Sequence, residues 1–355
     1  MSVTIDQVKA LPKVELHDHL DGGLRPTTVL ELARQIGHQP PASDPAELGR
    51  WFFDQANSGS LPAYLETFDQ TLAVMQQTEH LARVAREAVA DLAEDGVVHA
   101  EIRFAPELHT KQGLELDQIV DAVLSGLAEG RQDYPQISTG LIVCSMRQAN
   151  RQAEVAALAL RHRARGVVAF DLAGPEAGFR PERFLDCFRE LQLASMPITL
   201  HAGEADGLES IQQAIHLAGA LRLGHGLRLV DDITNWDQPD QAELGHLAHW
   251  VRDQAVALEL CPTSNLQTAA ASDYAGHPIT ALKDLGFTVT VNCDNRLMSN
   301  TSVSQEMMHL VEQAGWQLAD LARATLDAAS SAFLHQDRRQ DLIDCAIAPK
   351  LANLL

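Results

Sequence analysis

The stretch VELHDHLDGG, residues 14–23, decides the fold. Its apolar start predicts a β-strand, and the glycine pair Gly22-Gly23 ends it. Side chains two apart on a strand point to the same side, so we expect His17 and His19 to project together. Two imidazoles suit zinc or a neighbouring transition metal, but they make only half of a metal site. On their own they fit equally well a polar strand end with two unrelated histidines.

The composition limits the classes of protein that the chain can belong to. A length of 355 residues allows one large α/β barrel or two ordinary domains. The hydrophobic content of 46%, with only 5% aromatic residues, suits a helical shell rich in Ala and Leu around a core of strands. The net charge of −21 opposes binding to duplex nucleic acid or to an anionic membrane. It permits a small neutral substrate.

The sequence also favours a cytoplasmic location. It contains no apolar run of about eighteen residues, and the segment from Met1 to Lys13 has no apolar core of a signal peptide. The cysteines are odd in number and widely scattered, which predicts reduced thiols rather than disulfides. They are Cys144, Cys187, Cys261, Cys293 and Cys345.

Eight short apolar runs, each followed by a helix-like segment, predict an α/β fold. The expected strands are residues 14–20, 97–105, 137–145, 167–172, 197–201, 221–225, 255–261 and 287–292. The expected helices include residues 79–94, 116–130, 152–165, 181–193, 208–218, 241–252 and 278–285. Strands separated by helices imply a parallel sheet, and eight such units close into a (β/α)₈ TIM barrel with its active site at the carboxyl ends of the strands. The rival is a doubly wound open sheet, but no Gly-x-Gly-x-x-Gly motif follows any strand.

The chain shows no repeat or interdomain linker, so we expect residues 1–355 to form a single barrel domain. One crossover is unusually long, because about eighty residues separate the first two strands. This helical insertion contains Trp51-Phe52-Phe53 and the apolar residues 61–65 around a loose segment, residues 57–60. We expect either an extra helix pair packed on the barrel or an apolar lid over its mouth, and the two are compatible.

Chemically active residues gather where the expected strands end. The fifth, sixth and eighth strands end in His201-Ala202-Gly203-Glu204, Gly224-His225-Gly226 and Asn292-Cys293-Asp294-Asn295. Since these ends converge in a barrel, three histidines and an aspartate can form a catalytic zinc site with one open position. The predicted ligands are His17, His19, His201 and Asp294.

A single zinc ion per chain is expected. Binuclear barrel hydrolases carry a modified lysine at the end of the fourth strand, where this sequence has Phe170-Asp171-Leu172-Ala173-Gly174. We interpret the histidines in helices and loops as solvated or structural. They are His38, His80, His162, His216, His246, His249, His277, His309 and His335.

Together these motifs resemble the adenosine deaminase family. The resemblance begins at residues 13–22 and continues through residues 168–174, His201-Ala202-Gly203-Glu204, Gly224-His225-Gly226 and Asn292-Cys293-Asp294. The motifs follow the family order from the first strand to the eighth, so the similarity covers nearly the whole chain. The other zinc deaminase architecture needs His-x-Glu followed by Pro-Cys-x-x-Cys. The triplet His99-Ala100-Glu101 matches its first half, but no two cysteines stand three apart, and we interpret the triplet as the interior of the second strand.

The resemblance implies a reaction and a role for each site residue. The expected reaction is attack of a zinc-bound hydroxide on C6 of adenosine or 2′-deoxyadenosine, which yields inosine or deoxyinosine and ammonia, as in purine salvage. His17, His19, His201 and Asp294 match the zinc ligands of the family. Glu204 matches the acid that protonates N1, which requires a carboxyl with a raised pKa. His225 matches the group that orients or deprotonates the attacking water.

The resemblance also implies contacts with the substrate. His19 and Asp21 match residues that contact the substrate, Asp21 at the ribose, and the backbone N–H of Gly174 matches a contact to N3. Asn295 departs from the pattern, because many members have a second aspartate there that contacts N7. An asparagine amide donates to N7 without any pKa shift, so the same purine remains compatible.

Two other functions stay open. One is a deaminase of free adenine or another 6-aminopurine derivative, but such relatives tend to have Glu in place of Asp21, which favours a ribose-bearing substrate here. The other is a non-catalytic nucleoside-binding barrel. The presence of Glu204 and of every expected ligand argues against it. The sequence leaves the oligomeric state open.

Overall fold

Eight parallel strands form the centre of the computed structural model, which describes residues 3–59 and 61–354. The strands are β1 (Lys13–His19), β2 (Val97–Phe104), β3 (Ser138–Met146), β4 (Val167–Ala173), β5 (Thr199–Ala202), β6 (Arg222–His225), β9 (Ala257–Leu260) and β10 (Val289–Val291). They pair as two four-stranded sheets with the orders β1-β2-β3-β4 and β10-β9-β6-β5.

Two isolated parallel bridges join the sheets into a ring. Phe170 of β4 pairs with Ile198 ahead of β5, and Asp18 of β1 pairs with Asp294 just after β10. At the second junction, the backbone N–H of Asp294 donates to His17 O and that of His19 donates to Asp294 O, each over 2.7 Å. The predicted (β/α)₈ barrel is therefore confirmed, and its first and last strands meet at predicted zinc ligands.

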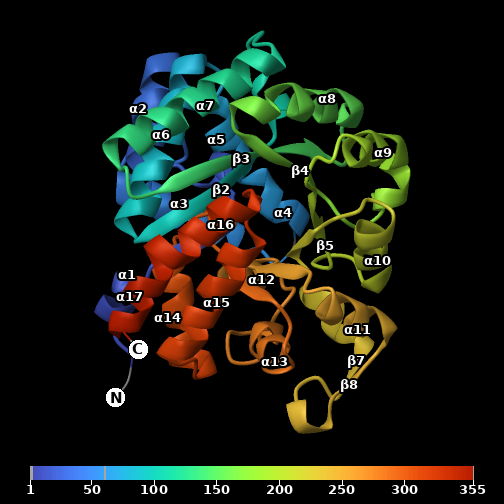
Figure 1. Ribbon diagram of the computed structural model, residues 1–355. Helices are drawn as coiled ribbons and strands as arrows, with labels where there is room; N and C mark the ends of the chain where they lie inside the picture. Colours follow the sequence, from blue (N-terminus) through green and yellow to red (C-terminus); the bar gives the residue numbers. More distant parts are fainter. Residues whose placement is uncertain (1–2, 60, 355) are drawn as a thin grey trace.

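Helices form the outer layer around the strands (Figure 1). The α-helices are α1 (Ile5–Ala10), α2 (Pro26–Ile36), α3 (Pro45–Ala56), α4 (Leu61–Glu66), α5 (Phe68–Val74), α6 (Thr78–Glu94), α7 (Leu116–Asp133), α8 (Gln152–His162), α9 (Leu185–Leu193), α10 (Leu208–His216), α11 (His246–Asp253), α12 (Pro262–Gln267), α13 (Pro278–Asp284), α14 (Val303–Ala314), α15 (Leu318–Ser331), α16 (Gln336–Asp341) and α17 (Ala348–Leu354). A π-helical turn, Leu342–Ile347, links α16 to α17.

Amphipathic patterning explains why these helices pack on the barrel. In α6, for example, Leu81, Val84 and Ala88 recur at helical spacing and are buried, whereas the opposite face carries charged side chains. The strands inside are covered on both sides, so β2 is buried along its whole length.

The segment after β6 differs from the sequence prediction. Residues 241–252 were expected to form one helix, but Ile233–Thr234 (β7) and Glu243–Leu244 (β8) pair as a small antiparallel hairpin, and α11 begins only at His246. Asp232 accounts for the change, because its carboxylate accepts the N–H of Ala248 over 2.8 Å and caps α11. A Cβ at Gly245 would lie 2.1 Å from this carboxylate, so the turn between hairpin and helix requires glycine.

The long insertion after β1 forms the helices α2 to α5. Phe52 and Tyr64 of this insertion are buried. Part of the predicted loose segment is anchored, because the N–H of Gly59 donates to the backbone oxygen of Gln267 over 2.9 Å. Ser60 lies outside the described residues. The insertion is thus a packed helical layer, and its action as a lid stays a prediction.

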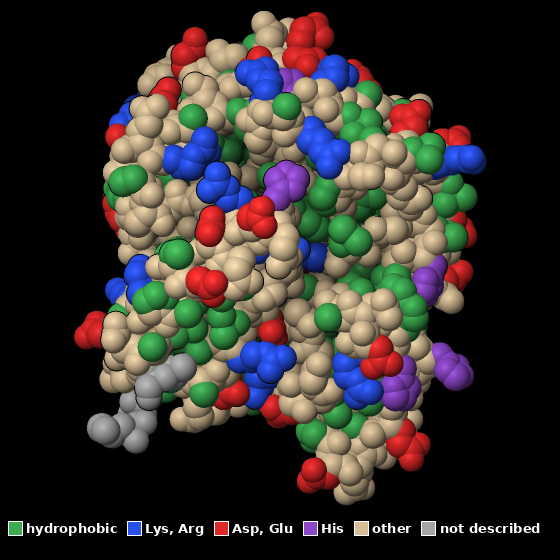
Figure 2. Space-filling view, in the orientation of Figure 1, with side chains coloured by type: hydrophobic (Ala, Val, Ile, Leu, Met, Phe, Trp, Pro, Cys, Tyr) green, Lys and Arg blue, Asp and Glu red, His purple; other side chains and the backbone are tan. Residues whose placement is uncertain are grey.

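The surface matches the acidic, mixed-charge composition. On the face in Figure 2, cationic and anionic side chains are interspersed, and hydrophobic side chains gather around a hollow near its centre. Within residues 3–59 and 61–354, every helix is too short or too polar to cross a bilayer.

Candidate active site

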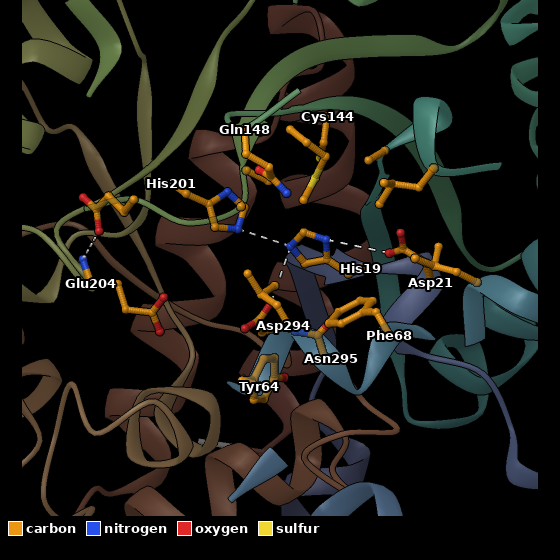
Figure 3. Close-up of a pocket in the computed structure, with 18 of the residues that line it drawn as sticks. His19, Asp21, Tyr64, Phe68, Cys144, Gln148, His201, Glu204, Asp294 and Asn295 are labelled. Atoms are coloured by element: carbon orange, nitrogen blue, oxygen red, sulfur yellow. Dashed lines mark hydrogen bonds and ion pairs between the residues drawn. The ribbon is translucent and has the colours of Figure 1, made fainter. Parts of the chain in front are cut away.

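Four predicted ligands converge at the carboxyl ends of the strands. The ligand atoms of His17, His19, His201 and Asp294 all lie within 4.8 Å of one another. Nε2 of His201 is 3.1 Å from Nε2 of His17 and 3.2 Å from Nε2 of His19. Figure 3 shows His19, His201 and Asp294 pointing toward a common point.

The spacing of these atoms suits a single zinc ion that all four residues share. Oδ1 of Asp294 is 3.5 Å from Nε2 of His17 and 3.4 Å from Nε2 of His19. Zinc bonds to nitrogen and oxygen are ~2.0–2.2 Å long, so neighbouring ligand atoms of one ion lie roughly 3–4 Å apart. The donor set of three imidazoles and one carboxylate therefore suits zinc in type and in spacing.

Buried carboxylates behind the histidines orient their rings. Nδ1 of His17 is 2.9 Å from Oε2 of Glu259, and Nδ1 of His201 is 2.9 Å from Oδ2 of Asp171. Each carboxylate can accept the Nδ1 proton, which leaves Nε2 as the ligand atom. The guanidinium of Arg103 lies between the two carboxylates, 2.6 Å from Glu259 and 3.0 Å from Asp171.

The protonation of the histidines follows from this setting. Burial, together with the Arg103 charge, lowers the pKa of His17 to about 4, so its imidazole is neutral and able to bind a metal at neutral pH. Burial likewise lowers the pKa of His19. Burial also opposes the charged form of His201, but the Asp171 carboxylate outweighs it and raises the pKa of His201.

Two site residues have a left-handed backbone. Asp294 has φ +59° and His225 has φ +66°, a region that non-glycine residues rarely occupy. Such conformations cost of order 1–3 kcal/mol and persist only where the surroundings hold them. The parallel bridge to Asp18 of β1 stabilises this conformation of Asp294. The hydroxyl of Ser264 adds a hydrogen bond, which it donates to Oδ2 over 2.6 Å.

Glu204 lies beside this cluster in a dry environment. It is only 6% exposed, and burial raises the pKa of its carboxyl. Oε2 is 3.5 Å from Nε2 of His225, and Oε1 accepts bonds from Thr268 over 2.9 Å and from Asn265 over 3.1 Å. Burial, the largest influence, favours the neutral acid that can donate a proton, against the opposing effects of His225 and of the bond from Thr268.

Glu176 holds the loop that carries Glu204. Its buried carboxylate accepts the backbone N–H groups of residues 203–206 over 2.6 to 3.1 Å and the hydroxyl of Ser210 over 2.5 Å. These bonds give the backbone N–H groups of a tight turn their acceptors, and they fix the position of Glu204.

A cavity of about 940 Å³, including its open mouth, adjoins the cluster. It is lined by the predicted substrate residues His19, Asp21, Gly174 and Asn295, and by Glu204 and His225. Apolar side chains of the insertion, Leu65, Phe68 and Leu72, close one side. A mostly apolar cavity with a few polar groups is typical of a small-molecule site.

The polar lining groups have unused bonding capacity. Oδ1 of Asp21 and Oδ1 of Asn295 are buried and have no hydrogen-bond partner among the described residues. Gly174 has φ +92°, and a Cβ there would lie 2.5 Å from Oε1 of Gln148, so glycine is required where the backbone meets the cavity. A Cβ at Gly22 would lie 1.9 Å from Oδ1 of Asn295, which shows how closely the turn after β1 packs on this side chain.

The structure brings together every residue that was predicted as a ligand, acid or substrate contact, but it adds others that were missed. These are Asp171, Glu176, Glu259, Asn265, Thr268 and His277. Glu259 carried a usable signal, because it is a charge inside an otherwise apolar strand. His99 and Glu101 lie inside β2, as predicted, where Glu101 pairs with Arg222.

The fold and the site are those of a barrel hydrolase with a cluster of side chains that can hold a metal ion. A family model described as adenosine deaminase matches residues 12–349. An adenosine deaminase of Mycobacterium marinum is 52% identical over 99% of this chain and 98% of its own length. Adenosine deaminase 1 of Streptomyces coelicolor is 51% identical over 98% of this chain and 89% of its own. The chain belongs to the adenosine deaminase family, and it is therefore a hydrolase that acts on carbon–nitrogen bonds.

Solved structures give the same fold. An adenine deaminase of Arthrobacter aurescens superimposes with a TM-score of 0.85 at 26% identity, over 97% of this chain and 98% of that one. An Arabidopsis N6-mAMP deaminase superimposes with a TM-score of 0.81 at 25% identity, over 95% and 98%.

Proposed function

We propose that the protein converts adenosine and 2′-deoxyadenosine to inosine and deoxyinosine, with release of ammonia. The observation that carries the proposal is the convergence of three Nε2 atoms and a carboxylate beside a buried acid, at the bottom of a cavity of nucleoside size. The names of the curated relatives support the choice of adenosine.

We assign His17, His19, His201 and Asp294 as the ligands of one zinc ion per chain. The spacing of their ligand atoms supports this assignment, as do the carboxylates that fix the rings of His17 and His201. A zinc ion held there supplies a Lewis acid that lowers the pKa of water to about 7.

We assign Glu204 as the acid that protonates N1 of the purine. Nucleophilic addition at C6 places electron density on the ring, and a proton at N1 stabilises it. The raised pKa of Glu204 supports the role, because a neutral carboxyl has a proton to give. We assign His225 as the second catalytic residue, which orients or deprotonates the attacking water.

We assign the remaining polar groups to the rest of the substrate. The unpaired Oδ1 of Asp21 offers an acceptor to a ribose hydroxyl, and His19 lies beside it, with Nδ1 4.0 Å away. The N–H of Gly174 is assigned to N3. Oδ1 of Asn295 lies against Gly22, which supports Nδ2 as the donor to N7.

A deaminase of adenine or another 6-aminopurine is the alternative, since an adenine deaminase shares the fold. The unpaired Asp21 acceptor argues for a ribose-bearing substrate. The test is the ultraviolet absorbance change of zinc-loaded protein with adenosine, 2′-deoxyadenosine and adenine side by side. We expect high kcat/KM for both nucleosides and little for adenine. A preference for adenine would overturn the choice of substrate.

We further infer one domain over residues 1–355, a cytoplasmic location, and small-molecule partners rather than nucleic acid or membrane. The bridge between β1 and the end of β10 supports the single domain, because it ties the two ends of the barrel together. The free state of all five cysteines supports the location, since such thiols are usual in a reducing compartment.

A further inference from the structure

Asn265 of α12 connects the two groups assigned to proton handling. Its Nδ2 is 3.1 Å from Oε1 of Glu204 and 3.1 Å from Nδ1 of His225. Its Oδ1 is 3.2 Å from Nε2 of His277. Asn265 and His277 are fully buried, and neither lines the substrate cavity.

The direction of these bonds is fixed at the start of α13. The backbone N–H of Ile279 donates to Nδ1 of His277 over 3.1 Å. A backbone N–H only donates, so Nδ1 is an acceptor and carries no proton. Burial lowers the pKa of His277 to about 3, so the ring is neutral. Its proton is therefore on Nε2, which donates to Oδ1 of Asn265.

The orientation of the Asn265 amide follows. With Oδ1 occupied by His277, the two hydrogens of Nδ2 point to Glu204 and His225. Both hydrogens are donated, so Oε1 of Glu204 and Nδ1 of His225 act as acceptors.

We propose that Asn265 and His277 are positioning residues that place two protons for catalysis. Together with Thr268, which also donates to Oε1, they keep the acid proton of Glu204 on Oε2. They also hold His225 as the tautomer with its proton on Nε2. These two atoms lie 3.5 Å apart. His225 then presents an N–H and acts by orienting the attacking water rather than by deprotonating it. The catalytic part of this inference rests on the proposed function.

The test uses Asn265→Asp, which keeps the shape of the side chain and replaces two donated hydrogens by an acceptor. Because the new carboxylate only accepts, Glu204 should carry its proton on Oε1 and His225 should carry a proton on Nδ1, and both should donate to it. We expect kcat with adenosine to fall by ~10²-fold or more, the scale of a lost general acid. KM should change little, because Asn265 lies outside the cavity lining.

A spectroscopic readout needs no turnover. In zinc-loaded protein with ¹⁵N-labelled histidine, Nδ1 of His225 should show the chemical shift of a non-protonated ring nitrogen. His225→Gln identifies the signal by its loss. In Asn265→Asp the same nitrogen should become protonated. The NMR measurement reports the tautomer of His225 whether or not the protein turns over substrate. A parent protein that fails to deaminate adenosine would therefore overturn the proposed function but not the assigned tautomer.

Two variants separate this role from a structural one. His277→Asn keeps an acceptor that caps α13 but removes the Nε2 donor, so kcat should fall while the melting temperature stays close to that of the parent. Gln267→Glu changes another buried amide on α12, bonded to Met298 and Ser299, and should leave the His225 signal unchanged. A protonated Nδ1 of His225 in the parent, or unchanged kcat in Asn265→Asp, would overturn the proposal.

Discussion

Nδ1 of His17 and Oε2 of Glu259 lie 2.9 Å apart, and both side chains are fully buried. Glu259 also pairs with Arg103 and Arg222, over 2.6 Å each, so its position is fixed from three sides. A predicted metal ligand is thus oriented by a residue on the opposite half of the barrel.

Glu259→Gln should weaken zinc binding by ~10–100-fold, the usual cost of losing a carboxylate behind a ligating histidine. The measurement is competition with a chelator of known affinity. Glu101→Gln is the matched control, because Glu101 is a buried partner of Arg222 that lies in β2 and touches none of the four predicted ligands. Equal zinc affinity in the parent and Glu259→Gln would contradict the role of Glu259.

Glu204→Gln removes the transferable proton and keeps the size of the side chain. We expect kcat for adenosine to fall by ~10²–10⁴-fold, the range for a lost general acid. The zinc content, measured by atomic absorption, should remain near one per chain, because Glu204 is outside the predicted ligand set. Loss of zinc in the variant would place Glu204 among the ligands instead.

Asn295 should discriminate adenosine from 7-deazaadenosine. The C7–H of the analogue leaves the Asn295 amide without an acceptor in a buried site, a loss of ~1–3 kcal/mol, so its kcat/KM should be lower. Asn295→Leu should be poor with adenosine and nearly indifferent between the two nucleosides. If parent and variant discriminate equally, Asn295 does not contact N7.

Asp21→Ala should lower kcat/KM for adenosine much more than for adenine, because only the nucleoside has a ribose to bind. The loss of a hydrogen bond to a charged or partly charged acceptor is worth ~1.5–3 kcal/mol. A parallel loss for both substrates would show that Asp21 acts on the site as a whole and not on the ribose.

The sequence predicts those features of the fold and the site that depend on local motifs or on a repeated pattern of strands and helices. The alternation of strands and helices predicts the barrel, and the motifs at the strand ends predict the ligands and Glu204. The partners of these residues are harder to predict, because their contacts span long sequence separations. Glu259 lies 242 positions from His17, and nothing near either residue signals the pairing. The shift of α11 has the same origin, since the carboxylate of Asp232 acts across the intervening hairpin.

The most direct test of the central claim is a zinc titration of metal-free protein, with adenosine deamination followed by absorbance. We predict no turnover without metal, a linear rise as zinc is added, and saturation at one zinc per chain. Full activity in protein verified to be metal-free would contradict the account.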